Sequence, residues 1–107
     1  MVVNSTADIK DNIEKYKGTA TYEILNTDVC EYTLNEPVAA KTRNAVGKNI
    51  GFVIGEGFQI SPEIVFEDGK GVSMYDALAL SYKAIQELHG RCAELEQQII
   101  ELKGGAL

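Results

Sequence analysis

Residues 74–103 decide the fold, and they read MYDALALSYKAIQELHGRCAELEQQIIELK. The stretch contains no proline. Ser73 and Asp76 form a capping box at its start, and Gly104-Gly105 follows it as a stop signal. The pattern therefore predicts one helix of about 30 residues, which would be about 45 Å long.

Apolar residues recur in this helix with a period of seven and occupy the a and d positions of more than three heptads. We call this face the seam; apart from the polar Ser81, its members are Leu78, Ile85, Leu88, Cys92, Leu95, Ile99 and Leu102. A domain of this length has a radius of gyration of about 13 Å. The helix is therefore expected to extend beyond the rest of its own domain, here called the head, and to bury the seam against other chains as a coiled coil.

The heptads predict an oligomer but do not determine how many chains it contains. Isoleucine at a with leucine at d is typical of two-stranded coils, but Cys92 and Ser81 dilute that preference. The alternative to a coiled coil is a long helix that packs on the sheet through one wide apolar face.

Residues 5–16 predict a short amino-terminal helix. Ile9, Ile13 and Tyr16 fall on one helical face. Ser5, with the aspartate three residues later, makes a capping box at the start of that helix.

The rest of the chain before the long helix predicts short strands and turns. Alternating or β-favouring residues indicate strands at 29–34 and 49–54, whereas 19–26 is ambiguous between helix and strand. Asp68-Gly69 signals a turn. The expected fold class is α+β: a small mixed head with an exposed polar arm at 35–48, followed by the long helix.

The arm is longer than an ordinary connection, a length typical of functional loops. It is also the one locally basic segment, with Lys41, Arg43 and Lys48. Nucleotide binding by these residues is left open, although no phosphate-binding motif supports it.

The charge balance narrows the class of function. Ten lysines and arginines against sixteen aspartates and glutamates give a net charge of −6. This sign argues against partners such as nucleic acid or an anionic membrane, which need a basic surface. The two cysteines, Cys30 and Cys92, lie far apart with no Cys/His cluster, so the sequence predicts no metal, no cofactor and no disulfide framework.

Several segments, taken in order, match the motifs of one family. They are Ser5 with Lys10-Asp11-Asn12-Ile13, then Gly51-Phe52-Val53-Ile54-Gly55-Glu56, Pro62-Glu63-Ile64-Val65, Tyr75-Asp76-Ala77-Leu78 and Ala84-Ile85-Gln86-Glu87-Leu88. On these motifs the chain resembles the intramolecular chaperone domain at the C-terminus of bacteriophage tailspikes, neck appendages and endosialidases. Thr6 and Asp8 depart from the family motif, which has aspartate and arginine at those places.

The resemblance implies a homotrimer with parallel helices that assists folding of the fibre or spike region preceding it and then cuts itself off. The cut would fall between Asn4 and Ser5, with Ser5 as the nucleophile and Lys10 as the general base of a single-turnover serine peptidase. Residues 1–4 would be an upstream remnant. Residues 5–73 would be the head, whose arm reaches onto the fibre or spike region. Residues 74–107 would be the coiled coil and tail. The domain would act in the host cytoplasm during phage assembly and be absent from the mature virion.

The residues alone permit blander interpretations. Ser5 can be a helix N-cap and Lys10 a solvated surface residue. The chain can also be a permanent oligomerisation module without cleavage, or a small acidic coiled-coil adaptor that binds a partner helix through the seam.

Overall fold

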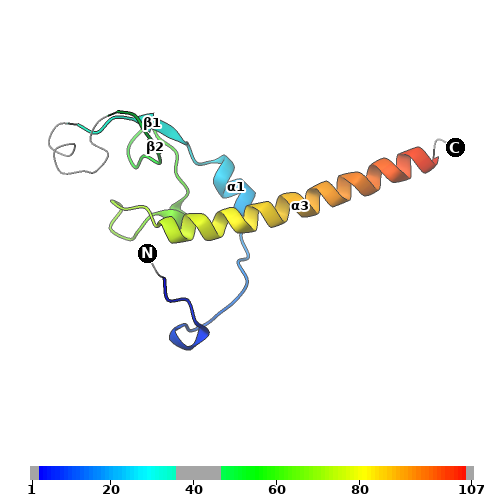
Figure 1. The fold of residues 1–107 in the computed structure, drawn as a ribbon, viewed down its shortest axis with the longest axis horizontal. Coiled ribbons are helices and arrows are strands. Elements are labelled where there is room, and N and C mark those ends of the chain that lie inside the picture. Colours follow the sequence, from blue (N-terminus) through cyan, green and yellow to red (C-terminus); the bar gives the residue numbers. More distant parts are fainter. Residues whose placement is uncertain (1–2, 36–46, 106–107) are drawn as a thin grey trace.

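The computed structural model describes residues 3–35 and 47–105. In this part the protein is a small mixed α+β fold with a two-stranded sheet and a long C-terminal helix (Figure 1). The elements in order are a 3-10 helix at Ala7–Ile9, α1 at Ala20–Leu25, β1 at Cys30–Tyr32, β2 at Asn49–Gly51, a second 3-10 helix at Pro62–Ile64, and α3 at Met74–Gly105.

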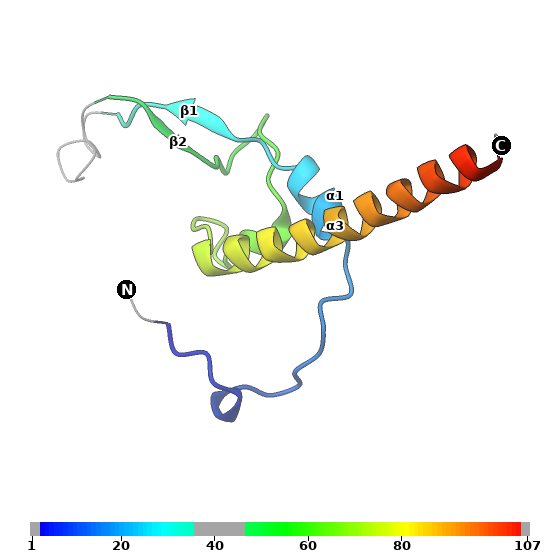
Figure 2. The same cartoon turned by 45° about the vertical axis from the view of Figure 1, so that its right-hand side comes forward.

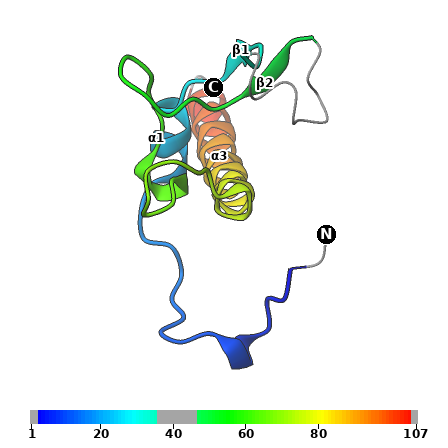
Figure 3. The ribbon, with the colours of Figure 1, turned by 90° about the vertical axis from the view of Figure 1, so that its left-hand side faces the viewer.

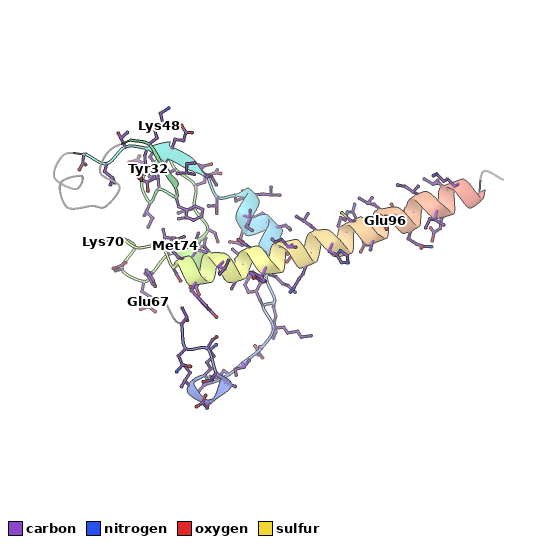
Figure 4. The ribbon with its side chains drawn as sticks, in the orientation of Figure 1. Tyr32, Lys48, Glu67, Lys70, Met74 and Glu96 are labelled. Carbon is purple, nitrogen blue, oxygen red and sulfur yellow. The ribbon has the colours of Figure 1, made fainter. Side chains whose placement is uncertain are left out.

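Helix α3 begins where the capping box predicts. The Ser73 hydroxyl accepts a hydrogen bond from the Asp76 backbone N–H at 3.2 Å, and the Ser73 carbonyl accepts one from the Ala77 N–H at 3.0 Å. Every residue from Leu88 to Gly104 is exposed. The half of α3 around Glu96 projects away from all other elements (Figure 4). The prediction of a helix that outruns its head is confirmed.

The head packs on one stripe of α3, which we call the packing stripe: Ala77, Leu80, Ala84 and Glu87. The core consists of Leu80 and Ala84 from this stripe together with Ala20 and Ile64. These stripe residues occupy c and g positions of the heptads, so they lie on a different face from the seam. The described residues do not show a helix packed on the sheet through one wide apolar face, because α3 packs on α1 and the second 3-10 helix through c and g positions and leaves the seam residues exposed.

Helix α1, only six residues long, takes its N-terminal cap from α3. The Glu87 carboxylate accepts hydrogen bonds from the Ala20 and Thr21 backbone N–H groups, both at 2.9 Å, and from the Thr21 hydroxyl at 2.8 Å. Thr19, at the N-cap position, makes no side-chain cap bond. A negative charge at a helix N-terminus satisfies otherwise unpaired N–H groups and complements the helix dipole. The ambiguous segment 19–26 thus becomes helical because another element caps it.

Hydrogen bonds join the end of α1 to the second 3-10 helix. The buried Ser61 hydroxyl donates to the Glu23 carboxylate at 2.6 Å and accepts from the Glu63 N–H at 3.1 Å. The Ser61 N–H donates to the Thr27 hydroxyl at 2.9 Å. These contacts hold Ile64 against α3.

The two predicted strands pair, but over fewer residues than expected. β1 and β2 are antiparallel, with Cys30 opposite Gly51 and Tyr32 opposite Asn49. The Asp68-Gly69 turn is confirmed, because Gly69 has a φ of +71° and the Val65–Val72 bridge closes over it.

Most of the arm lies outside the described residues, and so do Lys41 and Arg43. Lys48, which is described, directly precedes β2 (Figure 4) and forms an exposed ion pair with Glu31 of β1 at 3.7 Å.

The predicted amino-terminal helix is wrong. Only Ala7–Ile9 forms a turn of 3-10 helix, and residues 3–18, here named the strap, run mostly without regular structure on the side of α3 opposite the sheet (Figures 2 and 3). Asn12 has a φ of 53°, which breaks a right-handed helix. Ile9 and Ile13 are 57% and 65% exposed, so no packing surface stabilises a helical face.

The Glu87 cap predicts an acid-dependent stability. Hydrogen bonds from the Thr21 and Ala20 backbone lower the pKa of the Glu87 carboxyl below its ordinary value of 4.5. A lowered folded-state pKa stabilises the fold fully above the unfolded value and stops doing so as the pH falls through the folded value. We expect Glu87→Gln to lower the thermal midpoint at pH 7, with a difference from wild type that shrinks below about pH 4.

Glu94→Gln is the matched control, because Glu94 occupies the same heptad position as Glu87 one repeat later. Its carboxylate forms an exposed ion pair with Arg91 and caps no helix. Circular dichroism melts at pH 7 and pH 3.5 would measure both variants. Equal midpoints for Glu87→Gln and Glu94→Gln at pH 7 would contradict the role given to this cap.

Candidate functional site

Ser5 and Lys10, the predicted dyad, are in direct contact. The Lys10 Nζ lies 2.6 Å from the Ser5 Oγ and 3.1 Å from the Ser5 carbonyl oxygen. The interpretation of Ser5 as a helix N-cap does not fit, because Thr6 holds the N-cap position of the short turn.

The 3-10 turn between Ser5 and Lys10 brings the two side chains into contact. The Lys10 N–H donates to the Ala7 carbonyl at 3.1 Å, and the backbone then becomes extended at Lys10, with φ −126° and ψ 144°. One tight turn therefore reverses the chain so that the lysine side chain reaches back to the serine. A continuous α-helix is not needed to join two residues five positions apart.

A third residue completes the cluster. The Tyr75 hydroxyl lies 3.0 Å from the Ser5 Oγ, and Tyr75 belongs to the first turn of α3. The Ser5 oxygen thus has an amine and a phenol as neighbours. The strap returns toward the start of α3 at this point (Figure 1).

The residue before Ser5 is held by the turn as well. The Asn4 side-chain oxygen accepts hydrogen bonds from the Thr6 hydroxyl at 3.2 Å and from the Thr6 N–H at 3.4 Å. Thr6, which departs from the family motif, therefore orients the residue on the far side of the Asn4–Ser5 bond.

The chemistry open to this cluster is nucleophilic attack by a hydroxyl. A serine becomes a nucleophile when an adjacent base takes its proton, and a lysine can do so only where desolvation favours the neutral amine. Ser5, Lys10 and Tyr75 are all exposed in the described chain. Among the described residues the hydrogen-bond geometry is present, whereas the burial that would favour a neutral amine is not.

The seam is exposed along its length. Exposed fractions are 56% for Leu78, 66% for Ile85, 55% for Leu88, 42% for Leu95, 52% for Ile99 and 75% for Leu102, and Cys92 is exposed too. A row of exposed large apolar side chains at heptad spacing is the pattern that coiled coils bury between chains.

Two residues of the site region were missed by the sequence interpretation, namely Tyr75 and Glu87. Periodicity assigned both only to the long helix. No local signal marked them, because their hydrogen-bond partners lie 66 to 70 positions away in the chain.

The strap meets the head near its other end, at Tyr16. Partial burial raises the pKa of the Tyr16 phenol, and the Glu63 and Glu23 carboxylates raise it further. This end of the strap carries no nucleophile or base near Ser5.

Within residues 3–35 and 47–105, no group of three or more His, Cys, Asp or Glu side chains is placed to hold a metal ion. None of the helices described there has both the length and the apolar character to cross a bilayer. Comparison of the chain with models of known families, with curated proteins and with solved structures finds no match.

The Ser5–Lys10 contact predicts the reactivity of a thiol placed at position 5. In Ser5→Cys, a nearby ammonium would stabilise the thiolate, so we expect the introduced thiol to be alkylated several-fold faster with Lys10 present than in Ser5→Cys/Lys10→Met. Peptide mapping after a pulse of iodoacetamide would measure both rates, with the native Cys30, which lies outside the seam, as the internal reference. Equal alkylation rates in the two variants would mean that the amine does not lie beside position 5.

Proposed function

We propose that the chain is a trimerising intramolecular chaperone for the fibre or spike region N-terminal to it, and that it releases itself by autoproteolysis between Asn4 and Ser5. The observation that carries this proposal is the 2.6 Å contact between Lys10 Nζ and Ser5 Oγ. The order of the matched motifs supports three copies and a phage assembly role in the host cytoplasm. The alternatives are a permanent oligomerisation module and an acidic adaptor.

The proposed reaction is an intramolecular acyl shift followed by hydrolysis. The Ser5 Oγ attacks the Asn4 carbonyl carbon while Lys10 takes the hydroxyl proton. The Asn4–Ser5 C–N bond breaks, and Lys10 returns the proton to the departing Ser5 amine. Water, again activated by Lys10, then cleaves the ester and leaves an Asn4 carboxylate and a free Ser5 amino terminus.

Assembly would supply the exclusion of water from Ser5 and Lys10 that the single chain lacks. The chain exposes 9239 Å², against about 5,900 Å² for a compact monomer of this length. Its radius of gyration is 19.5 Å, against about 13 Å for a compact domain. Both differences support burial of a large surface between copies, and the exposed seam is the apolar part of it.

The proposed trimer predicts that charge in the seam dissociates the assembly. Leu95→Asp would place three carboxylates in one buried layer, where they can be neither hydrated nor paired. We expect sedimentation equilibrium to give a trimer mass for wild type and a monomer mass for Leu95→Asp.

Gln97→Asp is the matched control, because it adds the same charge two residues away at an f position outside the seam. It should keep the trimer mass. A wild-type chain that is monomeric at every concentration until a partner is added would favour the adaptor instead.

The dyad predicts a cut that needs both side chains and the assembly. Cleavage would shorten the chain by residues 1–4, which intact-mass spectrometry detects, and a folded reporter fused ahead of Met1 would be released. We expect Ser5→Ala and Lys10→Ala each to reduce cleavage to background while the trimer persists. Leu95→Asp should block cleavage although residue 95 lies far along α3.

Two results would contradict this proposal in different ways. Cleavage of Ser5→Ala at the same bond would assign the chemistry to another residue or to a contaminating protease. A trimeric wild type that is never cut would favour the permanent oligomerisation module.

A further inference from the structure

We infer that Tyr75 is a third catalytic residue of this site, and that it makes the reactivity of Ser5 depend on the assembly of α3. This inference rests on the proposed function and adds to it a residue and a route of control. It is carried by the 3.0 Å contact between the Tyr75 hydroxyl and the Ser5 Oγ.

Tyr75 provides the hydrogen bond that joins the reactive turn to the rest of the protein. The other side-chain hydrogen bonds of described residues 3–10 connect residues at most five positions apart, whereas the Ser5–Tyr75 bond spans 70 positions. The position of the nucleophile relative to the helix therefore depends on this phenol.

The chemistry defines the direction of the hydrogen bond during the reaction. The Ser5 hydroxyl must give its proton to Lys10, so the Tyr75 O–H donates to a remaining lone pair of the Ser5 oxygen. As the serine O–H bond breaks, negative charge develops on that oxygen. A donor fixed at hydrogen-bond distance stabilises this charge more than it stabilises the neutral hydroxyl.

Tyr75 also lies beside the seam. Counting from Leu78 at a, Tyr75 occupies the e position of the preceding heptad, and Tyr82 occupies the next e position. Tyr75, Leu78, Ala79 and Tyr82 line one shallow depression on α3. A second copy packed on the seam would cover this depression, restrict the Tyr75 ring and exclude water from the Ser5 oxygen.

Assembly can change the surroundings of Tyr75 in this way because the head does not cover the first turn of α3. Tyr75 is 47% exposed and Met74 is 64% exposed, whereas Leu80, on the packing stripe, is 9% exposed. Burial of the Tyr75 ring is thus left to contacts between copies.

The test removes one oxygen atom and keeps the ring. We expect Tyr75→Phe to slow cleavage of the full chain by about 10- to 100-fold, the rate equivalent of one hydrogen bond to an oxygen that gains charge. Tyr22→Phe is the control, since it makes the same change at an exposed tyrosine of α1 outside the site and the seam, and it should be cut at the wild-type rate. Both variants should keep the trimer mass in sedimentation equilibrium.

A thiol at position 5 separates a donating hydroxyl from a structural ring. The Tyr75 O–H would donate to a thiolate at that position and lower the pKa of the thiol, so we expect iodoacetamide to alkylate Ser5→Cys faster than Ser5→Cys/Tyr75→Phe. A ring that acted only by packing would leave the two alkylation rates equal.

The outcomes distinguish this inference from the proposed function. If wild type is cut, Ser5→Ala is not, and Tyr75→Phe is cut at the wild-type rate, the inference is overturned and the dyad stands. The inference also fails if Tyr75→Phe loses the trimer mass, because the hydroxyl would then act in assembly. A trimeric wild type that is never cut overturns both.

Discussion

The packing stripe of α3 is the surface on which the head is built. Ala77, Leu80 and Ala84 offer small or flexible apolar side chains to α1 and to the second 3-10 helix, and Glu87 ends the stripe with a carboxylate that caps α1. Neither short element contains enough residues to be helical alone in water. Their structure therefore depends on a helix that follows them in the sequence.

The two faces of α3 separate two kinds of contact. The packing stripe makes contacts within the chain and ends at Glu87, whereas the seam is uncovered and continues to Leu102. Because the faces are distinct, contact between copies along a and d would not compete with the head for the same side chains. Tyr75 belongs to neither face, which leaves its hydroxyl available to Ser5.

The long helix and the positions of the two strands could be predicted from the sequence because their signals are local. A capping box at Ser73 and a heptad pattern define α3, alternation indicates the first strand, and β-favouring residues indicate the second, whereas the pairing of the two strands was not predicted. The strap could not be predicted, because its helical period at Ile9, Ile13 and Tyr16 has no surface to pack on in this chain. The family resemblance, and not the Ser5–Lys10 spacing alone, indicated a site at these residues, and the contact forms through a 3-10 turn instead of the expected helix. Tyr75 could not be found from spacing at all, since its partner is 70 residues away.

If copies associate through the seam, the small core would make the fold of this protein depend on its own concentration. Only Ala20, Ile64, Leu80 and Ala84 form the buried apolar cluster of the described chain. When association stabilises the folded state, mass action makes the folded fraction rise with the amount of protein. Tethering the copies to one another replaces bulk concentration by an effective concentration, which is of millimolar order for short flexible connections. The folded state of such a chain would then report how many copies are held together, and dilution would unfold it unless a linkage keeps the copies as neighbours.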